Sequence, residues 1–273
     1  MKKITALALA ALMLLTLGAC GSKSTSQTGS SSNTDAASSD LEYIQNKGTM
    51  IIGITEYEPM NFKKDDEWTG FDTEFAKLVC EKLGVKPEFL IIDWDNKIPE
   101  IDSKAIDCVW NGMTLTNEVT SSMACTNPYV INAQVVVMNK DKVGEYKDAA
   151  SLKDLKLTAE SGSAGEKAIE EAGLKSNCTA VATQSDALME VASGSADACV
   201  IDNTMANAMT GDGTSYKDLA PGISLTEEKY GIGFRKGSDL VEKLNEFFKK
   251  SYADGTMMQT AEKYGVQAAV IAQ

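Results

Sequence analysis

Residues 50–92 read MIIGITEYEPMNFKKDDEWTGFDTEFAKLVCEKLGVKPEFLII, and this stretch contains the alternation that decides the fold. Met50–Thr55 and Phe89–Ile92 are apolar runs with the length and composition of buried strands. Between them, apolar residues recur at helical spacing over Asp72–Leu83, and Asp72 can cap the first turn of that helix. The stretch therefore predicts a strand, a helix and a second strand, which is the unit of a parallel sheet.

The same alternation continues to the end of the chain and appears twice in sequence order. Further strands are expected at Ala105–Trp110, Gln134–Asn139, Leu155–Ala159, Ala198–Ile201 and Gly231–Phe234, and further helices at Asn96–Ser103, 165–172, Asp186–Ser193, Asp239–Ala253 and Met257–Tyr264. No segment repeats with a period of 20–50 residues, so a solenoid is excluded. The sequence predicts an α/β fold with mainly parallel strand pairing.

Composition excludes several classes of function. The 273 residues carry 26 Lys+Arg, 39 Asp+Glu and no His, with a formal net charge of −13. Nucleic-acid binders usually present a basic surface, so no nucleic-acid partner is expected. Catalytic triads and metal sites that need an imidazole are also excluded, and we expect no metal and no cofactor. Arg235 is the only arginine in the sequence.

The amino terminus has the three parts of a secretory signal. Lys2 and Lys3 precede an apolar run over Ile4–Leu17, which is shorter than the roughly 20 residues of a membrane span. The run ends in Leu-Gly-Ala before Cys20 and resembles the lipobox of bacterial lipoproteins, in which this Cys is lipidated. We expect a signal peptide at 1–19 and a lipidated, Ser-rich flexible tether at 20–40; the alternative is an ordinary signal with an incidental Cys.

Five cysteines follow Cys20, at Cys80, Cys108, Cys125, Cys178 and Cys199. An odd number leaves at least one unpaired within the chain. Three of them lie in apolar periodic segments, which favours buried thiols. One disulfide remains an open alternative.

The chain from 41 to 273 carries a series of short motifs in a fixed order. They are Gly53 to Tyr57-x-Pro59, Gly70-Phe71-Asp72, Ile98-Pro99 before Ile106-Asp107, Gly112-x-Thr114-x-Thr116, Asn127-Pro128-Tyr129, Ser151-Leu152-x-Asp154-Leu155, Gly194-x-Ala196-Asp197-Ala198 with Asp202, Tyr230 to Gly237, and Asp254-Gly255-Thr256. In this order and spacing the chain resembles the bacterial extracellular solute-binding proteins of family 3. These are the polar amino-acid receptors of ABC importers, and many of them are lipoproteins.

The resemblance implies a type II periplasmic-binding-protein-like fold, in which two α/β lobes are joined by two hinge crossings and enclose a ligand cleft. Mapped onto this sequence, the first lobe comprises 41–133 and 233–273, and the second comprises 139–227. The hinge strands are expected at about 134–138 and 229–232. Ligands of such sheets lie beyond the carboxyl ends of the strands.

The resemblance also implies two aromatic ligand contacts, Tyr57 after the first strand and Trp94 after the third. Such a pair can hold a flat group or a cation. The alternative for each ring is a place in the core. Side chains alternate along a strand, so of Trp110 and Asn111 only one can face the cleft, and the resemblance favours Asn111.

Polar contacts are implied at five further positions. Gly112 and Thr114 match the segment that holds an amino acid through main chain and hydroxyl groups. Ser163 and Ala164 open a helix whose free N–H groups can bind an anion; an ordinary helix start is the alternative. Asp202 matches the acid that accepts the ligand's ammonium group, and a simple turn residue is its alternative.

One departure bears on the ligand. Val119 occupies the position where the family usually has an arginine that binds the ligand's carboxylate. Glu56 and Glu160 instead add acids near the expected cleft, unless they point to solvent. We therefore expect a ligand that depends less on its carboxylate and is more cationic than usual, such as a basic amino acid or a small amine.

The predicted function is that of a monomeric, extracytoplasmic binding protein, anchored to the membrane through Cys20, that delivers its ligand to an ABC permease and ATPase. No catalytic residue is expected. The alternatives are a sensory ectodomain, which would need a partner because no signalling domain follows residue 273, and a cyclohexadienyl-dehydratase-like enzyme with Glu56 and Glu160 as acid and base. Neighbouring permease and ATPase genes would favour import.

Overall fold

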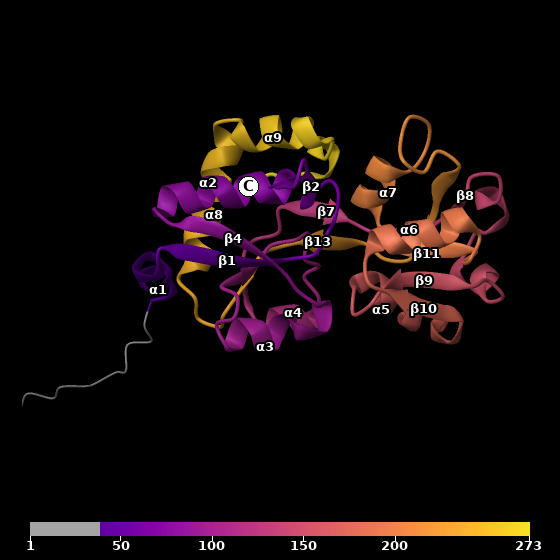
Figure 1. Ribbon diagram of the computed structural model, residues 1–273, viewed down its shortest axis with the longest axis horizontal. Helices are drawn as coiled ribbons and strands as arrows, with labels where there is room; N and C mark the ends of the chain where they lie inside the picture. Colours follow the sequence, from indigo (N-terminus) through magenta and orange to yellow (C-terminus); the bar gives the residue numbers. More distant parts are fainter. Residues whose placement is uncertain (1–38) are drawn as a thin grey trace, which may run out of the picture. The chain divides into compact units, whose positions relative to one another are not determined.

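The computed structural model describes residues 39–273, which belong to one compact unit (Figure 1). The expected signal peptide, the lipidation of Cys20 and nearly all of the tether lie outside the described residues. Within 39–273, no helix combines the length and the apolar character that crossing a membrane requires.

The described chain alternates between helices and strands. Its helices are α1 (Asp40–Lys47), α2 (Phe71–Leu83), α3 (Lys97–Asp102), α4 (Asn117–Ser122), α5 (Ala164–Glu171), α6 (Gln184–Ser193), α7 (Asn203–Met209), α8 (Leu240–Ala253) and α9 (Thr256–Tyr264). Its strands are β1 (Thr49–Ile54), β2 (Phe62–Lys64), β3 (Glu67–Thr69), β4 (Lys86–Ile91), β5 (Cys108–Val109), β6 (Ala124–Cys125), β7 (Val130–Asn132), β8 (Gln134–Asn139), β9 (Leu157–Glu160), β10 (Cys178–Val181), β11 (Ala198–Asp202), β12 (Leu219–Ser224), β13 (Glu228–Tyr230) and β14 (Gly233–Phe234). Five short 3-10 turns complete it, at Trp94–Asn96, Val143–Glu145, Ala149–Leu152, Lys175–Asn177 and Gln267–Ala269.

The first lobe is built on a five-stranded sheet in the order β4-β1-β5-β14-β6. β1 pairs in parallel with β4 over its whole length, from Thr49 opposite Lys86 to Ile54 opposite Ile91. Figure 1 shows α2, α8 and α9 on one face of this sheet and α3 and α4 on the other. Because both faces are covered, the interior strand β1 is apolar nearly throughout, as the sequence pattern predicted.

The second lobe contains another five-stranded sheet, in the order β10-β9-β11-β8-β12. Its strand β8 pairs antiparallel with both β11 and β12, and five of its six residues are buried. One face packs an apolar cluster against α5, which includes Ala168 and Ile169. The other face packs against α6, whose Leu188 is fully buried.

The lobes are joined by β7 and β13, which form an antiparallel ladder of their own. Glu228 lies opposite Asn132 in this ladder, and Tyr230 lies opposite Val130. The sequence placed the first crossing at 134–138, but these residues form most of β8, an interior strand of the second sheet between β11 and β12. The interior position of β8 depends on its pairing with β11 and β12, which are distant in the sequence, and a local pattern does not reveal this pairing.

Three other expectations differ from the structure. Each large sheet contains two parallel and two antiparallel ladders, so pairing is less parallel than expected. Gly70 is the N-cap residue of α2, and Asp72 does not cap the helix but is buried inside the lobe. The short helices α1, α4 and α7 were not expected.

The five cysteines of the described chain are all free. Cys80, Cys108 and Cys199 are buried, and Cys125 and Cys178 are half-buried. Burial raises the pKa of the Cys80 thiol to about 12. The structure therefore agrees with the expectation of buried thiols and not with the alternative of one disulfide.

Candidate functional site

The carboxyl ends of parallel strands from the two lobes carry the candidate site. Thr55 follows β1 and Trp94 follows β4 in the first lobe, while Glu160 ends β9 and Asp202 ends β11 in the second. The two sets are in contact, because the indole Nε1 of Trp94 donates a hydrogen bond to Oε2 of Glu160 at 3.1 Å. The lobes thus meet at the carboxyl ends of their strands, which is where ligands of α/β proteins bind.

Glu160 is a buried carboxyl group at this junction, with only 2% of its surface exposed. Burial raises the pKa of Glu160 to about 8, and the nearby charge of Asp202 adds to this rise, while hydrogen bonds from Trp94 and Thr55 oppose it. A cavity of about 440 Å³ lies here, lined by Asp93, Trp94, Asp95, Glu160 and Ser161 together with Ile92, Asn96 and Ala182. Three of these lining residues are acids and one is a large aromatic, so the cavity suits a cation. The sequence left open whether Glu160 points to solvent, and the structure excludes this.

Asp202 is nearly buried and accepts hydrogen bonds from four side chains. Its Oδ1 accepts from Asn132 Nδ2 at 2.6 Å, from Gln134 Nε2 at 2.7 Å and from the Tyr230 hydroxyl at 2.7 Å. Its Oδ2 accepts from Gln184 Nε2 at 2.7 Å. A carboxylate oxygen can accept about two hydrogen bonds, so Oδ2 retains capacity for a further donor such as an ammonium group.

Burial raises the pKa of the Asp202 carboxyl group to about 7. The negative charge of Glu228 contributes to the rise, and the hydrogen bonds from Tyr230, Gln184 and Gln134 oppose it. A cation bound at Oδ2 would favour the ionised form and lower this pKa.

Tyr57 does not present its ring to an open cleft, since only 1% of its surface is exposed. Its hydroxyl group hydrogen-bonds to Thr204 of the second lobe and to the hydroxyl of Tyr230 on β13, the latter at 2.6 Å. The rings of Tyr57 and Tyr230 meet edge to face, with their centroids 6.4 Å apart. Tyr57 therefore links the lobes directly, in place of the ligand contact that the sequence predicted.

Asn111 and Gly112 also differ from their expected roles. Asn111 is fully buried, and its amide bonds to the main chain of Thr55, to the Thr55 hydroxyl and to Asn61. The N–H of Gly112 donates to Oδ2 of buried Asp72 at 2.7 Å. Both residues lie inside the first lobe, where the side-chain amide of Asn111 and the N–H of Gly112 already have hydrogen-bond partners.

Gly112 adopts a φ of +54°, and a Cβ atom there would lie 2.6 Å from the Tyr57 ring. Thr114 is half-buried and forms an isolated bridge with Tyr230. The segment after β5 is thus held against β13, one of the strands that join the lobes. Of the ligand contacts predicted in this segment, only Thr114 is partly accessible.

Ser163 and Ala164 open α5 as expected. The Ser163 hydroxyl accepts from the N–H of Glu166 at 3.2 Å, and the N–H of Gly162 donates to Oε2 of Glu166 at 2.7 Å. The helix therefore supplies an internal carboxylate to part of its own amino end. Ala164 is half-buried at the first helical position.

Glu56 is exposed and makes no side-chain hydrogen bond or ion pair within residues 39–273. The sequence left open whether it points to solvent, and the structure supports that alternative. Val119 is buried in an apolar cluster of the first lobe beside Met113 and Met123, and its side chain has no group that could bind a carboxylate.

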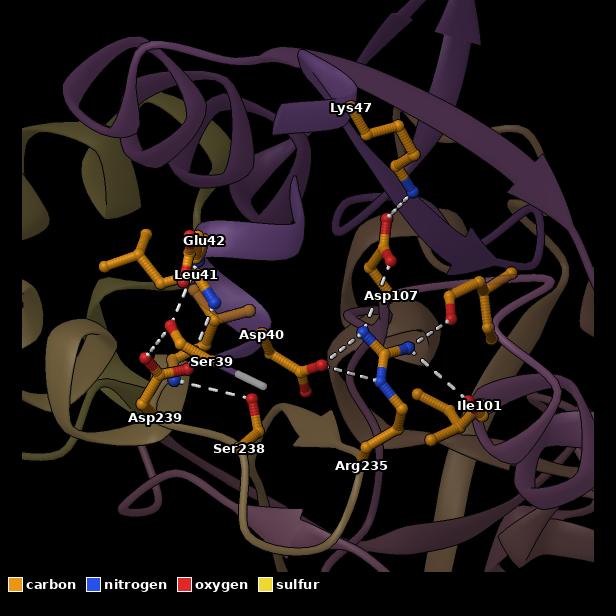
Figure 2. Close-up of polar contacts among 12 residues, drawn as sticks. Ser39, Asp40, Leu41, Glu42, Lys47, Ile101, Asp107, Arg235, Ser238 and Asp239 are labelled. Atoms are coloured by element: carbon orange, nitrogen blue, oxygen red, sulfur yellow. Dashed lines mark hydrogen bonds and ion pairs between the residues drawn. The ribbon is translucent and has the colours of Figure 1, made fainter. Parts of the chain in front are cut away.

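The sole arginine lies at the end of the first sheet that is opposite to the candidate site. Figure 2 shows Arg235 between Asp40 and Asp107, and Lys47 on the other oxygen of Asp107. Asp107 precedes β5 and Lys47 precedes β1, so this cluster lies at the amino ends of the strands. Within the described chain, no lysine or arginine comes within 4.0 Å of a carboxylate oxygen of Glu160 or Asp202.

Two lysines lie near the junction without reaching those acids. Lys97 donates to the main-chain oxygen of Trp94 at 2.9 Å, and burial lowers the pKa of its ammonium group. Lys167 of α5 lies 3.5 Å from Glu118 of α4, which joins the two lobes through an exposed ion pair.

The polar residues around Asp202 were missed by sequence reasoning. Asn132 precedes and Gln134 begins the apolar run of β8, and Gln134 lies directly opposite Asp202 in the β8–β11 ladder. Gln184 is the first residue of α6 and accepts the N–H of Asp202 at 2.9 Å. Polar residues at the start of an otherwise apolar strand were the available signal.

Comparison with known proteins gives matches over most of the chain. The profile of the bacterial extracellular solute-binding proteins, family 3, matches residues 50–267. The L-cystine-binding protein TcyJ of Escherichia coli K12 is 26% identical over 227 residues, covering 82% of this chain and 85% of TcyJ. The arginine-binding extracellular protein ArtP of Bacillus subtilis 168 is 29% identical over 273 residues, covering 97% of this chain and 98% of ArtP.

Among solved structures, the chain is similar to the ancestral amino acid-binding protein AncCDT-1, described as a precursor of cyclohexadienyl dehydratase. The identity is 31% and the TM-score 0.75, covering 83% of this chain and 99% of that one. Both curated relatives are named as binding proteins and not as enzymes. The two-lobed fold, the motif order and the family profile agree, and the chain therefore belongs to the bacterial extracellular solute-binding proteins of family 3.

Proposed function

We propose that this protein is the binding component of an ABC importer and that it captures a cationic amino acid or a related small amine between its lobes. The family and the named relatives support the import of an amino acid. One observation carries the cationic preference: Glu160 and Asp202 are buried carboxyl groups without a lysine or arginine partner in the described chain.

A ligand of this class would replace the missing positive charges. Its ammonium group would bind Oδ2 of Asp202, where one acceptor site remains. A second cationic group would lie against Trp94 and Glu160, where ring and carboxylate both favour it. A carboxylate, if present, would rely on Thr114 and the start of α5 at Ser163 and Ala164, without an arginine.

Delivery would require an ABC permease and its ATPase as partners. We further propose an extracytoplasmic monomer held at the membrane by a lipid on Cys20. Ligand binding would close the lobes by bending at β7 and β13, since these strands join them. Solution scattering should then show a smaller radius of gyration with saturating ligand than without; an equal radius in both would argue against closure.

The enzymatic alternative relied on Glu56 and Glu160 as an acid–base pair. In the structure Glu56 is exposed and Glu160 is buried, and no contact joins them. The absence of an arginine at Val119 also disfavours a carboxylated substrate. We therefore retain transport as the proposed function.

A thermal-shift screen tests this proposal with L-arginine, agmatine, L-citrulline, L-histidine, L-cystine and L-glutamate. Arginine shares its chain length with citrulline, which is neutral, and its guanidinium with agmatine, which lacks the carboxylate. We expect stabilisation by arginine and agmatine and little by citrulline; a ligand at 100 times its Kd adds about 2.7 kcal/mol. Stabilisation by cystine or glutamate alone would contradict the cationic preference and leave the transport role in place.

A further inference from the structure

Glu228 lies next to the proposed ammonium site but does not belong to it. It is half-buried on β13, the strand that returns the chain to the first lobe. Its Oε1 accepts hydrogen bonds from Asn132 Nδ2 and from Gln134 Nε2, both at 2.7 Å. These are the same two amide nitrogens that donate to Oδ1 of Asp202.

Each amide group therefore bridges two carboxylates. An amide nitrogen has two hydrogens, and in both residues one is directed to Asp202 and the other to Glu228. The strand register explains the arrangement, because Asn132 lies opposite Glu228 in the β7–β13 ladder and Gln134 lies opposite Asp202 in the β8–β11 ladder. The cluster occupies the junction between the connecting strands and the second sheet.

Further hydrogen bonds hold the amide oxygen of Asn132 and the main chain of Gln134. The Asn132 oxygen accepts from the N–H of Thr204 at 3.4 Å, which fixes which end of the amide faces the acids. The main-chain N–H of Gln134 donates to the Thr226 hydroxyl at 2.9 Å, and Thr226 contacts the other oxygen of Glu228 at 3.4 Å. Glu228 is thus the common acceptor for the amide hydrogens of Asn132 and Gln134 that point away from Asp202.

We propose that Glu228 is a positioning residue for the ammonium site: it orients the amides of Asn132 and Gln134 toward Asp202 and adds a second negative charge behind that carboxylate. This inference rests on the proposed function, because it assigns Asp202 to a ligand cation. It predicts that Glu228 controls both how readily Asp202 is protonated and how strongly the site attracts a cation.

The ionisable groups around Asp202 are few in the described chain. Glu228 and Tyr230 face it from β13, Tyr57 faces it from the segment after β1, and Glu160 faces it from the end of β9. The phenols of Tyr57 and Tyr230 have pKa values raised well above 10 by burial, so they stay neutral. Glu160, whose pKa is about 8, is largely protonated at neutral pH, and the negative charge of Glu228 is the one that raises the pKa of Asp202.

The test compares Glu228→Gln with Glu227→Gln. Glu227 is the adjacent, exposed acid, for which no side-chain hydrogen bond or ion pair is found among residues 39–273, so its variant removes the same charge without touching the amides. Carbon-13 NMR of the Asp202 carboxyl group, titrated without ligand, should show its midpoint lowered by about one pH unit in Glu228→Gln. Glu227→Gln should titrate as the wild type does.

Binding of L-arginine gives the second readout. At pH 9, where Asp202 is ionised in every variant, Glu228→Gln should bind arginine about tenfold more weakly. Its affinity should also change less between pH 6 and pH 9 than that of the wild type. A purely structural role would lower affinity without moving the midpoint.

The outcomes separate the two proposals. An unchanged Asp202 midpoint in Glu228→Gln would overturn the role of Glu228, whatever the ligand is. A shifted midpoint with no arginine binding in any variant would support Glu228 and count against the cationic ligand. If Glu228→Gln does not fold, Glu228→Asp keeps the charge but withdraws the acceptor from the amides. The amides should then donate more weakly to Asp202, and its midpoint should rise; an unmoved midpoint there would also contradict the proposal.

Discussion

The two ends of the first sheet treat buried acids in opposite ways. At the amino ends of the strands, Asp107 is fully buried but lies between Lys47 at 2.6 Å and Arg235 at 3.4 Å (Figure 2). At the carboxyl ends, where the second lobe meets the first, Glu160 and Asp202 are buried with only neutral hydrogen-bond donors. Burying a charged group without an oppositely charged partner costs free energy. Buried acids that have no basic side chain beside them therefore indicate a cationic ligand as the partner.

The only arginine, Arg235, has a structural role at the amino ends of the strands. Arg235 donates to Asp40 at 2.9 Å and to the main-chain oxygen of Ile106 at 3.1 Å, so it fastens α1 to the sheet. Ser39 and the N–H of Leu41 bond to Asp239 at the same edge. The arginine therefore stabilises the first lobe and is not available to the ligand.

The largest expected effect is at the amino ends of the strands, where the buried acids have cationic partners. Arg235→Met should destabilise the protein by about 3–5 kcal/mol, because it leaves Asp40 and part of Asp107 without a compensating charge. Denaturant unfolding measures the change. Lys140→Met is the matched control, since its pair with Asp218 at 3.3 Å is exposed and should contribute less than about 1 kcal/mol. Equal losses in the two variants would mean that the Arg235 cluster is not a buried anchor.

The next effect is at the carboxyl ends of the strands, where Asp202 has no cationic partner in the described chain. Asp202→Asn should weaken L-arginine binding by about 2–4 kcal/mol, because it removes the charge that accepts the ammonium group. Isothermal titration calorimetry gives the affinities. Asp218→Asn removes an exposed charge from the same lobe and should bind as the wild type does. Unchanged affinity in Asp202→Asn would remove Asp202 from the site.

A third prediction concerns pH. The folded-state pKa of Glu160, about 8, lies above its unfolded value near 4.5, so the folded protein holds this proton more tightly. Its contribution to stability is complete below about pH 4.5 and is lost as pH rises toward 8 and above. Glu160→Gln cannot ionise and should be more stable than the ligand-free wild type at pH 9, by a few kcal/mol.

Unfolding of both proteins at pH 5 and pH 9 measures this difference. The gain of the variant should appear at pH 9 and largely vanish at pH 5. A gain of the same size at both values would show that packing, and not ionisation of Glu160, separates the two proteins.

The smallest effect should come from the exposed contact between the lobes. Lys167→Gln breaks the 3.5 Å pair with Glu118, and because both side chains are about half exposed, it should change arginine affinity by less than about threefold. Calorimetry at low and high salt checks this. A larger loss would mean that closure depends on surface charge as well as on the buried acids.

Much of the fold could be predicted from the sequence because its signals are local. The apolar run of β1, the amphipathic α2 and the paired helices α8 and α9 all lie within a residue or two of their expected bounds. The sequence placed Trp94 and Asp202 at the carboxyl ends of strands, and the structure has Trp94 three residues after β4 and Asp202 as the last residue of β11. Their contact with a ligand stays a prediction.

The remaining features depend on partners far away in the chain. Tyr57 was expected to face a ligand, but its hydroxyl meets Thr204, which is 147 residues away. Asn111 is turned inward by the main chain of Thr55, and Gly112 by Asp72. The crossing was misplaced because only pairing with β11 and β12 shows that β8 is an interior strand of the second sheet. No local pattern contains these contacts.

The central claim is that the unpaired acids select a cationic ligand, and calorimetry of arginine and citrulline on wild type and Glu160→Gln tests it most directly. The wild type should prefer arginine by at least about tenfold, since the two ligands differ in the charged group that would face Glu160. Glu160→Gln should lose most of that preference by binding arginine more weakly while its affinity for citrulline changes little. Equal binding of both ligands by the wild type, or a preference that survives in Glu160→Gln, would contradict the account.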